Sequence, residues 1–378
     1  MNPLSPDLTG VTCRWVASGH DYFVRLIRAL DEARRSIRLE VYIFTRDPVG
    51  LAVRDALLRA ARRGVEVRVL LDALGSGQTD AGFWAELIHA GGQVRWFNPL
   101  HPVRSHRKLL VVDDRVAGTG GFNIAEEYTG DGVQKGWADL GIVLVGAEVM
   151  VLSDEFDRMW SVAAHGGRWK RLLSRRGGDV PKQVSPGISL LATRPGRMAG
   201  VFQIALKEDL RQARDILLVV AYFLPTRGIR KLLKSSALRG KRVRLVVPGH
   251  SDVVISRRAA RHLYGPLMRC GVEIYEYQPQ MLHAKLYLTD HSVFAGSSNL
   301  DVRSLYINHE IMLRVTDPQV VQEGWSLGES LCARSLRVDP KTWNTSRSWL
   351  ERQGDRWSWW LLSKFDPWAT RWIARDPR

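Results

Sequence analysis

Apolar residues recur at two spacings along the chain, and segments with the two spacings alternate. Between Tyr22 and Arg35, and again between Leu51 and Arg63, apolar residues fall three and four positions apart, which predicts an amphipathic helix in each segment. Short runs rich in Val, Ile, Leu and Tyr, such as SIRLEVYIF from Ser36, predict buried strands. This alternation predicts an α/β fold with mostly parallel sheets.

The strand patterns of the first half return in the second half, in the same order and at a nearly constant offset. The pairs are SIRLEVYIF from Ser36 with DILLVVAYF from Asp215, RGVEVRVLLD from Arg63 with GKRVRLVVPG from Gly240, GGQVRWF from Gly91 with CGVEIYEY from Cys270, and HRKLLVVDD from His106 with HAKLYLTDH from His283. Chance similarity would not preserve both order and spacing. The chain is therefore predicted to contain two homologous α/β/α domains that arose by duplication.

The repeat divides the chain into four parts. Residues 1–165 are predicted to form the first domain and residues 187–332 the second, and residues 166–186, rich in Gly, Pro and basic residues, are predicted to link them. Residues 333–378 have no counterpart in the repeat and mix Trp with Lys and Arg, which is typical of a segment at a membrane interface. A helix that caps the fold is the alternative, and Pro367 argues against one long continuous helix there.

Charge narrows the choice of partner. The chain has 378 residues, and 55 Lys and Arg against 39 Asp and Glu give a formal net charge of +16, which indicates nucleic acid or an anionic membrane as partner. The three Cys match neither a disulfide framework nor a CxxC metal spacing, and the first residues lack a signal-peptide pattern, so we expect a cytoplasmic protein. No apolar run approaches the roughly 20 residues of a transmembrane helix, so membrane contact should be peripheral.

One short motif occurs once in each half. The pattern H-x-K-x4-D is formed by His106, Lys108 and Asp113, and again by His283, Lys285 and Asp290. Residues two apart on a strand share one face, so each His and its Lys should face the same substrate. Both motifs, Asp113 and Asp290 included, form the candidate catalytic set, although each Asp lies beyond the strand and is expected to hold the turn there more than to contact substrate. A lone His on a strand is more often structural, but two in register, each with a Lys, favour catalysis.

Each motif is followed by a Gly-rich turn that ends in Asn. GTGGFN ends at Asn123 and AGSSN ends at Asn299. Small residues allow the backbone to approach a ligand closely, and Asn and Lys side chains donate to phosphate oxygens, so a phosphate pocket is predicted. We expect neither a metal ion nor another cofactor, because Lys beside each His repels a cation and no Cys or carboxylate stands at ligand spacing.

Paired motifs of this kind resemble the phospholipase D superfamily, and their surroundings are similar to bacterial cardiolipin synthases of the short form that lacks N-terminal transmembrane helices. The likeness covers roughly Gly19 to Leu331 and is carried by Asp113 through Glu127, AYFLP at Ala221, VPGHSD at Val247, IYEYQPQMLHAK, and GSSNLDVRS with Asn308 and Glu310. The resemblance implies two phospholipase D-like domains with the active site at their interface.

The resemblance also implies a reaction and a role for each candidate residue. A phosphatidyl group would pass from one phosphatidylglycerol to another through a phosphohistidine, giving cardiolipin and glycerol. His106 would be the nucleophile and His283 the general acid. The supporting residues would be Lys108, Lys285, Asn123 and Asn299 at the phosphoryl oxygens, and Asp139 and Glu310 behind the two His rings.

Other functions remain open from the sequence. A phospholipase D-type hydrolase or a nuclease would use the same His pair, but superfamily nucleases are often short single-motif chains, so we expect phospholipid and not nucleic acid as partner. A non-catalytic peripheral membrane-binding protein could share the fold, but intact motifs in both halves argue against it. We expect a peripheral protein at the cytoplasmic face of the cell membrane that binds phosphatidylglycerol and cardiolipin. The exact lipids and the oligomeric state are not fixed by the sequence, and a monomer is compatible with it.

Overall fold

The first half of the chain builds one sheet, with strand order β1-β7-β6-β5-β2-β3-β4. In the computed structural model, residues 11–97, 103–164, 180–196, 200–343 and 345–375 are described, with side chains described as far as residue 363. The strands of the first sheet are β1 (Thr12–Val16), β2 (Ser36–Val41), β3 (Glu66–Asp72), β4 (Gln93–Phe97), β5 (Leu109–Val112), β6 (Val116–Gly120) and β7 (Gly141–Val145). Residues 165–179, most of the predicted linker, lie outside the described residues.

The second half builds a larger sheet with the same central arrangement, in the order β16-β12-β11-β10-β13-β14-β15-β9-β8. Its strands are β8 (Lys182–Ser185), β9 (Ile188–Thr193), β10 (Asp215–Val219), β11 (Arg242–Pro248), β12 (Glu273–Tyr277), β13 (Leu286–Thr289), β14 (Val293–Gly296), β15 (Glu310–Val315) and β16 (Ser335–Arg337). Each segment of the sequence repeat contains one strand, and β10 to β13 occupy the positions that β2 to β5 occupy in the first sheet. The predicted α/β fold with two homologous halves is confirmed.

The prediction that both sheets are mostly parallel is wrong. Parallel pairing is confined to β2, β3 and β4 in the first sheet and to β10, β11 and β12 in the second, while the other neighbouring strands are antiparallel. The reason is the short connection after each motif: residues 113–115 alone join β5 to β6. A connection this short allows a hairpin, whereas parallel strands need a crossover of a dozen residues or more.

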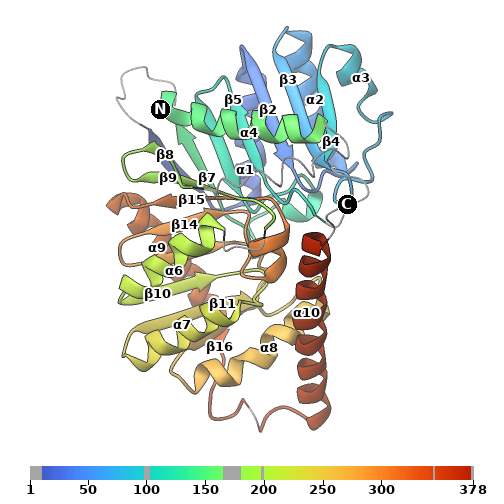
Figure 1. Ribbon diagram of the computed structural model, residues 1–378. Coiled ribbons are helices and arrows are strands. Elements are labelled where there is room, and N and C mark those ends of the chain that lie inside the picture. Colours follow the sequence, from blue (N-terminus) through green and yellow to red (C-terminus); the bar gives the residue numbers. More distant parts are fainter. Residues whose placement is uncertain (1–10, 98–102, 165–179, 197–199, 344, 376–378) are drawn as a thin grey trace.

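Helices lie on both faces of each sheet (Figure 1). The helices are α1 (Gly19–Glu32), α2 (Pro48–Arg62), α3 (Ala85–His89), α4 (Met150–Ala164), α6 (Val201–Gln212), α7 (Arg227–Leu238), α8 (Val254–Met268), α9 (Pro318–Ala333) and α10 (Trp349–Arg375), with short turns η1 (Glu126–Tyr128), η2 (Ala147–Val149) and η3 (Arg303–Ile307). Both predicted helices are confirmed, but each begins three residues earlier than expected. Capping explains the difference, because Ser18 accepts from the amide of Asp21 and Asp47 accepts from the amide of Gly50.

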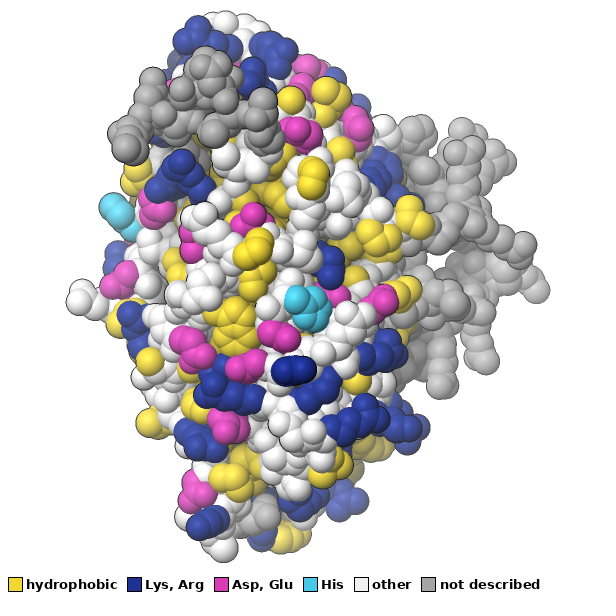
Figure 2. Space-filling model, turned by 90° about the vertical axis from the view of Figure 1, so that its left-hand side faces the viewer, with side chains coloured by type: hydrophobic (Ala, Val, Ile, Leu, Met, Phe, Trp, Pro, Cys, Tyr) yellow, Lys and Arg dark blue, Asp and Glu magenta, His cyan; other side chains and the backbone are white. Residues whose placement is uncertain are grey.

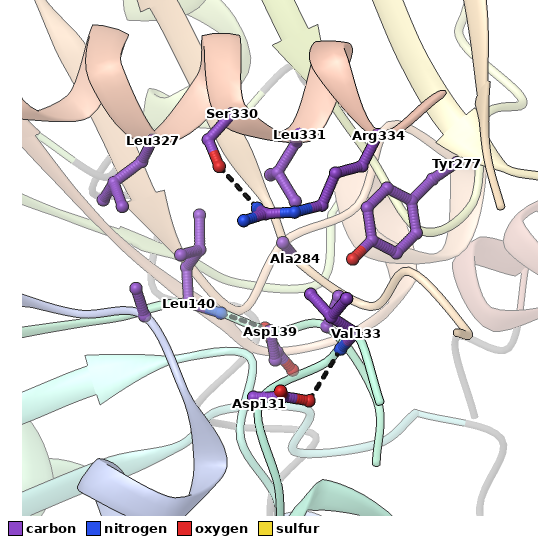
Figure 3. Close-up of a pocket in the computed structure, with 12 residues that line it drawn as sticks. Asp131, Val133, Asp139, Leu140, Tyr277, Ala284, Leu327, Ser330, Leu331 and Arg334 are labelled. Atoms are coloured by element: carbon purple, nitrogen blue, oxygen red, sulfur yellow. Dashed lines mark hydrogen bonds between the residues drawn. The ribbon is translucent and has the colours of Figure 1, made fainter. Parts of the chain in front are cut away.

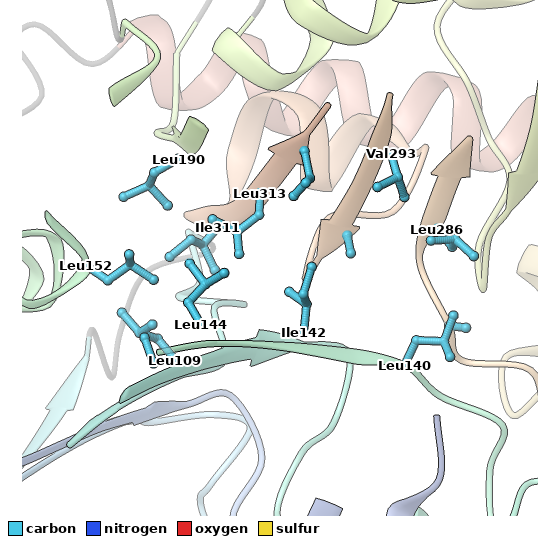
Figure 4. Packing of buried hydrophobic residues seen from close by; sticks show 14 of the residues in the cluster. Leu109, Leu140, Ile142, Leu144, Leu152, Leu190, Leu286, Val293, Ile311 and Leu313 are labelled. Carbon is cyan, nitrogen blue, oxygen red and sulfur yellow. The ribbon is translucent and has the colours of Figure 1, made fainter. Parts of the chain in front are cut away.

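The two halves share a core in which their sheets stack face to face (Figure 4). From the first sheet it takes Leu109, Val111, Ile142 and Leu144, and from the second it takes Leu286, Leu288, Ile311 and Leu313. Helices α4 and α9 lie beside this core, while α1 and α2 cover one outer core and α6, α7 and α8 the other. Because one apolar core joins the sheets, the halves are held as a single body and can build one site between them.

The last helix, α10, packs along α8 and extends toward the junction of the two halves (Figure 1). It passes through Pro367 without a break, so the expectation that Pro367 would prevent a long helix is wrong. A Pro late in a helix removes one backbone hydrogen bond, and it can be accommodated by a kink as well as by an end. Among the described residues, none of the helices combines the length and hydropathy needed to span a membrane.

Candidate active site

The two His-Lys motifs lie in extended segments that lead into the central strands, and not on the strands themselves. Strand β5 begins at Leu109 and β13 at Leu286, directly after Lys108 and Lys285. The expected placement on a strand is therefore wrong by one to three residues. His106 stays fixed because its amide donates to the carbonyl of His309 (3.0 Å), in the segment that leads into β15.

The second motif is held in the same way, by backbone hydrogen bonds to the other half of the chain. The amide of His283 donates to the carbonyl of Ala138 (2.8 Å), and the amide of Ala138 donates to the carbonyl of Met281 (2.8 Å). Each motif is thus paired through its backbone with the segment that precedes a strand of the other half. This reciprocal pairing brings the motifs together at the interface of the two sheets, which agrees with the predicted position of the site.

Each His ring forms a hydrogen bond with a carboxylate from the opposite half. Nδ1 of His106 lies 3.0 Å from Oε1 of Glu310, and Nδ1 of His283 lies 2.6 Å from Oδ2 of Asp139. Both carboxylates are buried, and each has a further partner: Ser297 donates its hydroxyl to Glu310, and the amide of Leu140 donates to Asp139 (2.8 Å). A carboxylate at Nδ1 holds the proton there and leaves Nε2 as the nitrogen for chemistry.

The two Lys and two His form one electrostatic cluster. Lys108 donates to the carbonyl of His106 (2.7 Å), and Lys285 donates to the carbonyl of His283 with its Nζ 3.1 Å from the Nε2 of that ring. The charge of Lys285 acts on His106 and that of Lys108 acts on His283. All four groups therefore lie within electrostatic range of one another.

Burial shifts the pKa of every titratable group in this cluster. Loss of water lowers the pKa of both imidazoles well below the usual value, lowers the pKa of the Lys108 ammonium to about 7 and that of Lys285 to about 8, and raises the pKa of Asp139 to about 7 and of Glu310 to about 8. Each carboxyl–imidazole pair is thus poised to share one proton at neutral pH. An entering phosphodiester would supply negative charge and favour protonated cations around it.

The two predicted Asn residues are both buried but differ in their contacts. Asn123 accepts from the amide of Ile43 (3.1 Å) and donates to the hydroxyl of Tyr128 (2.7 Å), which lies 3.4 Å from Nε2 of His283. Its amide therefore supports Tyr128 in this structure, a role that the sequence did not predict. Among the described residues, Oδ1 of Asn299 has no hydrogen-bond partner.

The two motif Asp residues lie at the far ends of β5 and β13 from the His residues. Asp113 accepts hydrogen bonds from the amides of Arg34, Arg35 and Ser36 at 2.7 to 2.9 Å, and Asp290 accepts from the amide of Arg214 (2.9 Å). The structure places these carboxylates at the start of β2 and β10, away from the His-Lys cluster. Their position fits the expected turn-holding role, and it separates them from the candidate catalytic groups.

A small cavity lies behind Asp139 at the junction of the halves (Figure 3). Its lining includes Leu140 and Ala284, with Leu331 and Arg334 from the end of α9 and Tyr277 from β12. Its volume of about 70 Å³ has room for a few water molecules, each of which takes about 30 Å³ in the liquid. It is too small for a lipid headgroup, so we do not assign substrate to it.

The carboxylate of Asp139 occupies the space where a side chain at Gly121, in the Gly-rich turn after the first motif, would lie. A Cβ at Gly121 would lie 2.0 Å from Oδ1 of Asp139. We expect Gly121→Ala to displace this carboxylate, misalign His283 and lower kcat about 100-fold, which is typical of a 1 Å misplacement in an active site. Gly118→Ala is the matched control, because a Cβ there meets nothing nearer than Val143 at 3.8 Å. Equal rates for the two variants would contradict this role of Gly121.

Three contributors could not be identified from the sequence motif. Tyr128 approaches His283, Ser297 holds Glu310, and Tyr42 packs its ring edge-on against His106 with centroids 5.0 Å apart. Tyr42 and Tyr128 lie far from the motifs along the chain. Only Ser297 carried a signal, because it belongs to the AGSSN turn that was expected to approach substrate.

Comparison with known proteins places this geometry in a family. Residues 26–160 and 206–327 match the family described as "Cardiolipin synthase, PLD-like domain". Cardiolipin synthase 1 of Bacillus cereus is 30% identical over 334 residues, which cover 84% of this chain and 66% of that protein. Cardiolipin synthase B of Salmonella typhimurium is 32% identical over 311 residues, which cover 79% of this chain and 75% of that protein.

The fold has a solved counterpart of nearly the same extent. The crystal structure of phosphatidylserine synthase from Haemophilus influenzae Rd KW20 superimposes with a TM-score of 0.73 at 15% identity and covers 96% of this chain and 94% of that one. The two-domain phospholipase D-like fold is thus shared at low sequence identity. The chain belongs to the cardiolipin synthase family with phospholipase D-like domains.

Proposed function

We propose that this protein is a phosphatidyltransferase that makes cardiolipin and glycerol from two molecules of phosphatidylglycerol through a phosphohistidine. The observation that carries the proposal is the reciprocal pair of carboxylate–imidazole contacts between the halves, with a Lys beside each His. Family membership supports a phospholipid as substrate. Because both substrates are lipids, we place the reaction at the membrane surface, at its cytoplasmic face.

In the first step, Nε2 of neutral His106 attacks the phosphorus of the donor lipid. The bond from phosphorus to the glycerol headgroup breaks, and protonated His283 gives its proton to the departing oxygen. The side chain of His106 is 13% exposed and that of His283 is 5% exposed, so His106 is the more accessible to a bulky phosphodiester. Burial lowers the pKa of both imidazoles, which favours a neutral nucleophile at His106. The proton that His283 donates is therefore the one that it shares with Asp139.

In the second step, His283 acts as the base. It takes the proton of a hydroxyl on the second phosphatidylglycerol, whose oxygen attacks phosphorus while the bond to His106 breaks. Asp139 and Glu310 stabilise whichever ring carries the extra proton, and Lys108 and Lys285 stabilise the non-bridging oxygens of the phosphoryl group. The two rings return to their starting protonation states.

Products from labelled phosphatidylglycerol in mixed micelles test the proposal. Purified protein should form labelled cardiolipin and release glycerol, and added EDTA should leave the rate unchanged because no step requires a metal ion. Phosphatidic acid as the sole lipid product would show that water is the acceptor and that the protein is a hydrolase. Turnover of plasmid DNA and not of lipid would favour a nuclease.

The Lys pKa values predict an alkaline limit on activity. Both ammonium groups must be charged to stabilise the phosphoryl oxygens, and their pKa values are lowered to about 7 for Lys108 and about 8 for Lys285. In the free enzyme kcat/KM should therefore fall as the pH rises above this range, up to about tenfold per pH unit for each group lost. In Lys108→Arg, the fall in kcat/KM that is caused by residue 108 should move to higher pH, since a guanidinium stays protonated. A value of kcat/KM that rises steadily to pH 10 would contradict this assignment.

A further inference from the structure

Among the described side chains of helix α10, most large apolar residues lie on the side that faces away from the protein. Its exposed apolar residues, whose exposed fractions run from 44% to 74%, are Trp349, Leu350, Trp357, Trp360 and Leu361. The residues that it turns toward the protein include Asp355 and Ser358, which are only 5% and 8% exposed. A surface helix of a soluble domain has the opposite polarity, with its apolar stripe on the core.

Specific contacts fix this orientation. Asp355 forms an ion pair with Arg347, and the ring of Trp359 stacks on His262 of α8 with centroids 4.9 Å apart. A rotation of α10 that buried Trp357 and Trp360 would expose Asp355 and break both contacts. The outward tryptophans are therefore part of how the helix is seated.

A second exposed apolar segment lies at the N-terminal end of α8, the helix on which α10 packs. Val253, Val254 and Ile255 are 39%, 58% and 36% exposed where α8 begins. They directly follow Asp252, which accepts from the hydroxyl of Tyr222 (2.8 Å) and whose charge acts on Lys285. Helix α8 also carries α10, so the two apolar segments belong to one pair of packed helices.

Helix α10 also contacts η3, in which Arg303 has a charge that acts on His106. We name the outer face of α10 together with residues 253–255 the tryptophan surface. Helix α10 therefore contacts an element whose charge reaches the catalytic cluster.

The charges around the tryptophan surface indicate what covers it. Arg352 and Arg356 are exposed on α10 among the tryptophans, and the whole chain carries +16. Trp at the depth of lipid headgroups and Arg on lipid phosphates are typical of a helix that lies in a membrane interface. A symmetric pair of chains would instead bring like charges together at this surface. On the face of the molecule away from α10, basic and acidic side chains are interspersed (Figure 2).

We propose that the tryptophan surface docks on an anionic phospholipid bilayer and holds the catalytic cluster at the level of the lipid headgroups. The docking stands on the exposed residues alone, while its purpose in catalysis rests on the proposed phosphatidyl transfer. Docking by this surface would deliver both lipid substrates from the plane of the membrane.

Co-sedimentation of the full chain with vesicles tests the docking. Wild type should bind vesicles of phosphatidylglycerol and phosphatidylcholine more tightly than vesicles of phosphatidylcholine alone. The double variant Trp357→Ser/Trp360→Ser should partition at least about tenfold more weakly, since it loses two interfacial side chains. Leu238→Ser at the end of α7 is the matched control, because Leu238 is 70% exposed outside the tryptophan surface, and it should bind like wild type.

Activity and sedimentation velocity separate the possible outcomes. The double variant should keep its rate on phosphatidylglycerol in detergent micelles and lose rate on vesicles. Equal vesicle binding by wild type and the double variant would overturn the proposal. If, in addition, wild type is a dimer and the double variant a monomer, the tryptophan surface is an interface between two copies of the chain. If no cardiolipin forms but vesicle binding still depends on Trp357 and Trp360, the transferase function fails and the docking surface stands.

Discussion

Replacing either His106 or His283 with Asn should lower cardiolipin formation on the order of 10⁴-fold or more, because one variant loses the nucleophile and the other loses the acid and base. The two variants should differ on a phosphatidyl ester of p-nitrophenol, whose leaving group departs without a proton. His283→Asn should release a stoichiometric burst of nitrophenolate and accumulate phosphatidylated His106, detectable by mass spectrometry of the intact protein. His106→Asn should show neither signal.

The comparison of the two variants also tests which ring attacks. A burst from His106→Asn, with the label on His283, would reverse the two roles. A burst from neither variant would argue against a covalent intermediate. His20→Asn is the control, because His20 is exposed on α1 and lies outside the site, so this variant should keep the wild-type rate.

Replacing Arg107 with Met should lower the free energy of unfolding by about 3–5 kcal/mol, as expected when one partner of a buried ion pair is removed. Arg107 is fully buried, with Nε 3.1 Å from Glu40 and Nη1 2.8 Å from Glu155. Glu155 would keep Arg158 and Lys182 as partners, whereas Glu40, among the described residues, would keep the hydroxyl of Ser105 at 2.6 Å and no ion pair. Urea unfolding monitored by circular dichroism measures the loss.

The loss should depend on pH with a definite sign. Burial already raises the pKa of Glu40, and loss of Arg107 would raise it further. A protonated Glu40 needs no counter-ion, so the penalty in Arg107→Met should shrink as the pH falls and grow as the pH rises. Arg28→Met is the control: Arg28 pairs with Glu32 at the surface, 61% and 45% exposed, and its loss should cost less than about 1 kcal/mol. Equal costs for the two variants would show that Glu40 is not left uncompensated.

The repeat and the period of its apolar residues were sufficient to predict the α/β class, the two halves and the strand positions, because these depend on patterns within each segment. Pairing direction was not predictable from period alone. The strands after Lys108 and Lys285 are as apolar as parallel strands but turn back in hairpins, so their direction depends on the length of the connection. The path of α10 through Pro367 was not predicted, because a Pro lowers helix propensity but does not by itself decide whether a helix ends.

The candidate site was predictable where its residues recur at fixed spacing, and less so where contacts cross between halves. His106, His283 and the two Lys follow from the motif, and they lie together in the structure. That Glu310 serves His106 while Asp139 serves His283 is a property of how the sheets stack, which no local pattern encodes. Tyr128 and Arg107 are further cases, since their partners are distant in sequence.

The exchange of carboxylates between halves constrains how such a protein could have arisen. A single ancestral half would have had an imidazole with no acid behind it, so it could have worked only as a twofold pair of identical chains, each lending its acid to its twin. Once two gene copies were fused, the two halves no longer had to have the same sequence. The acid became Asp in one copy, at position 139, and Glu in the other, at position 310, and the two imidazoles could then specialise for separate halves of the catalytic cycle.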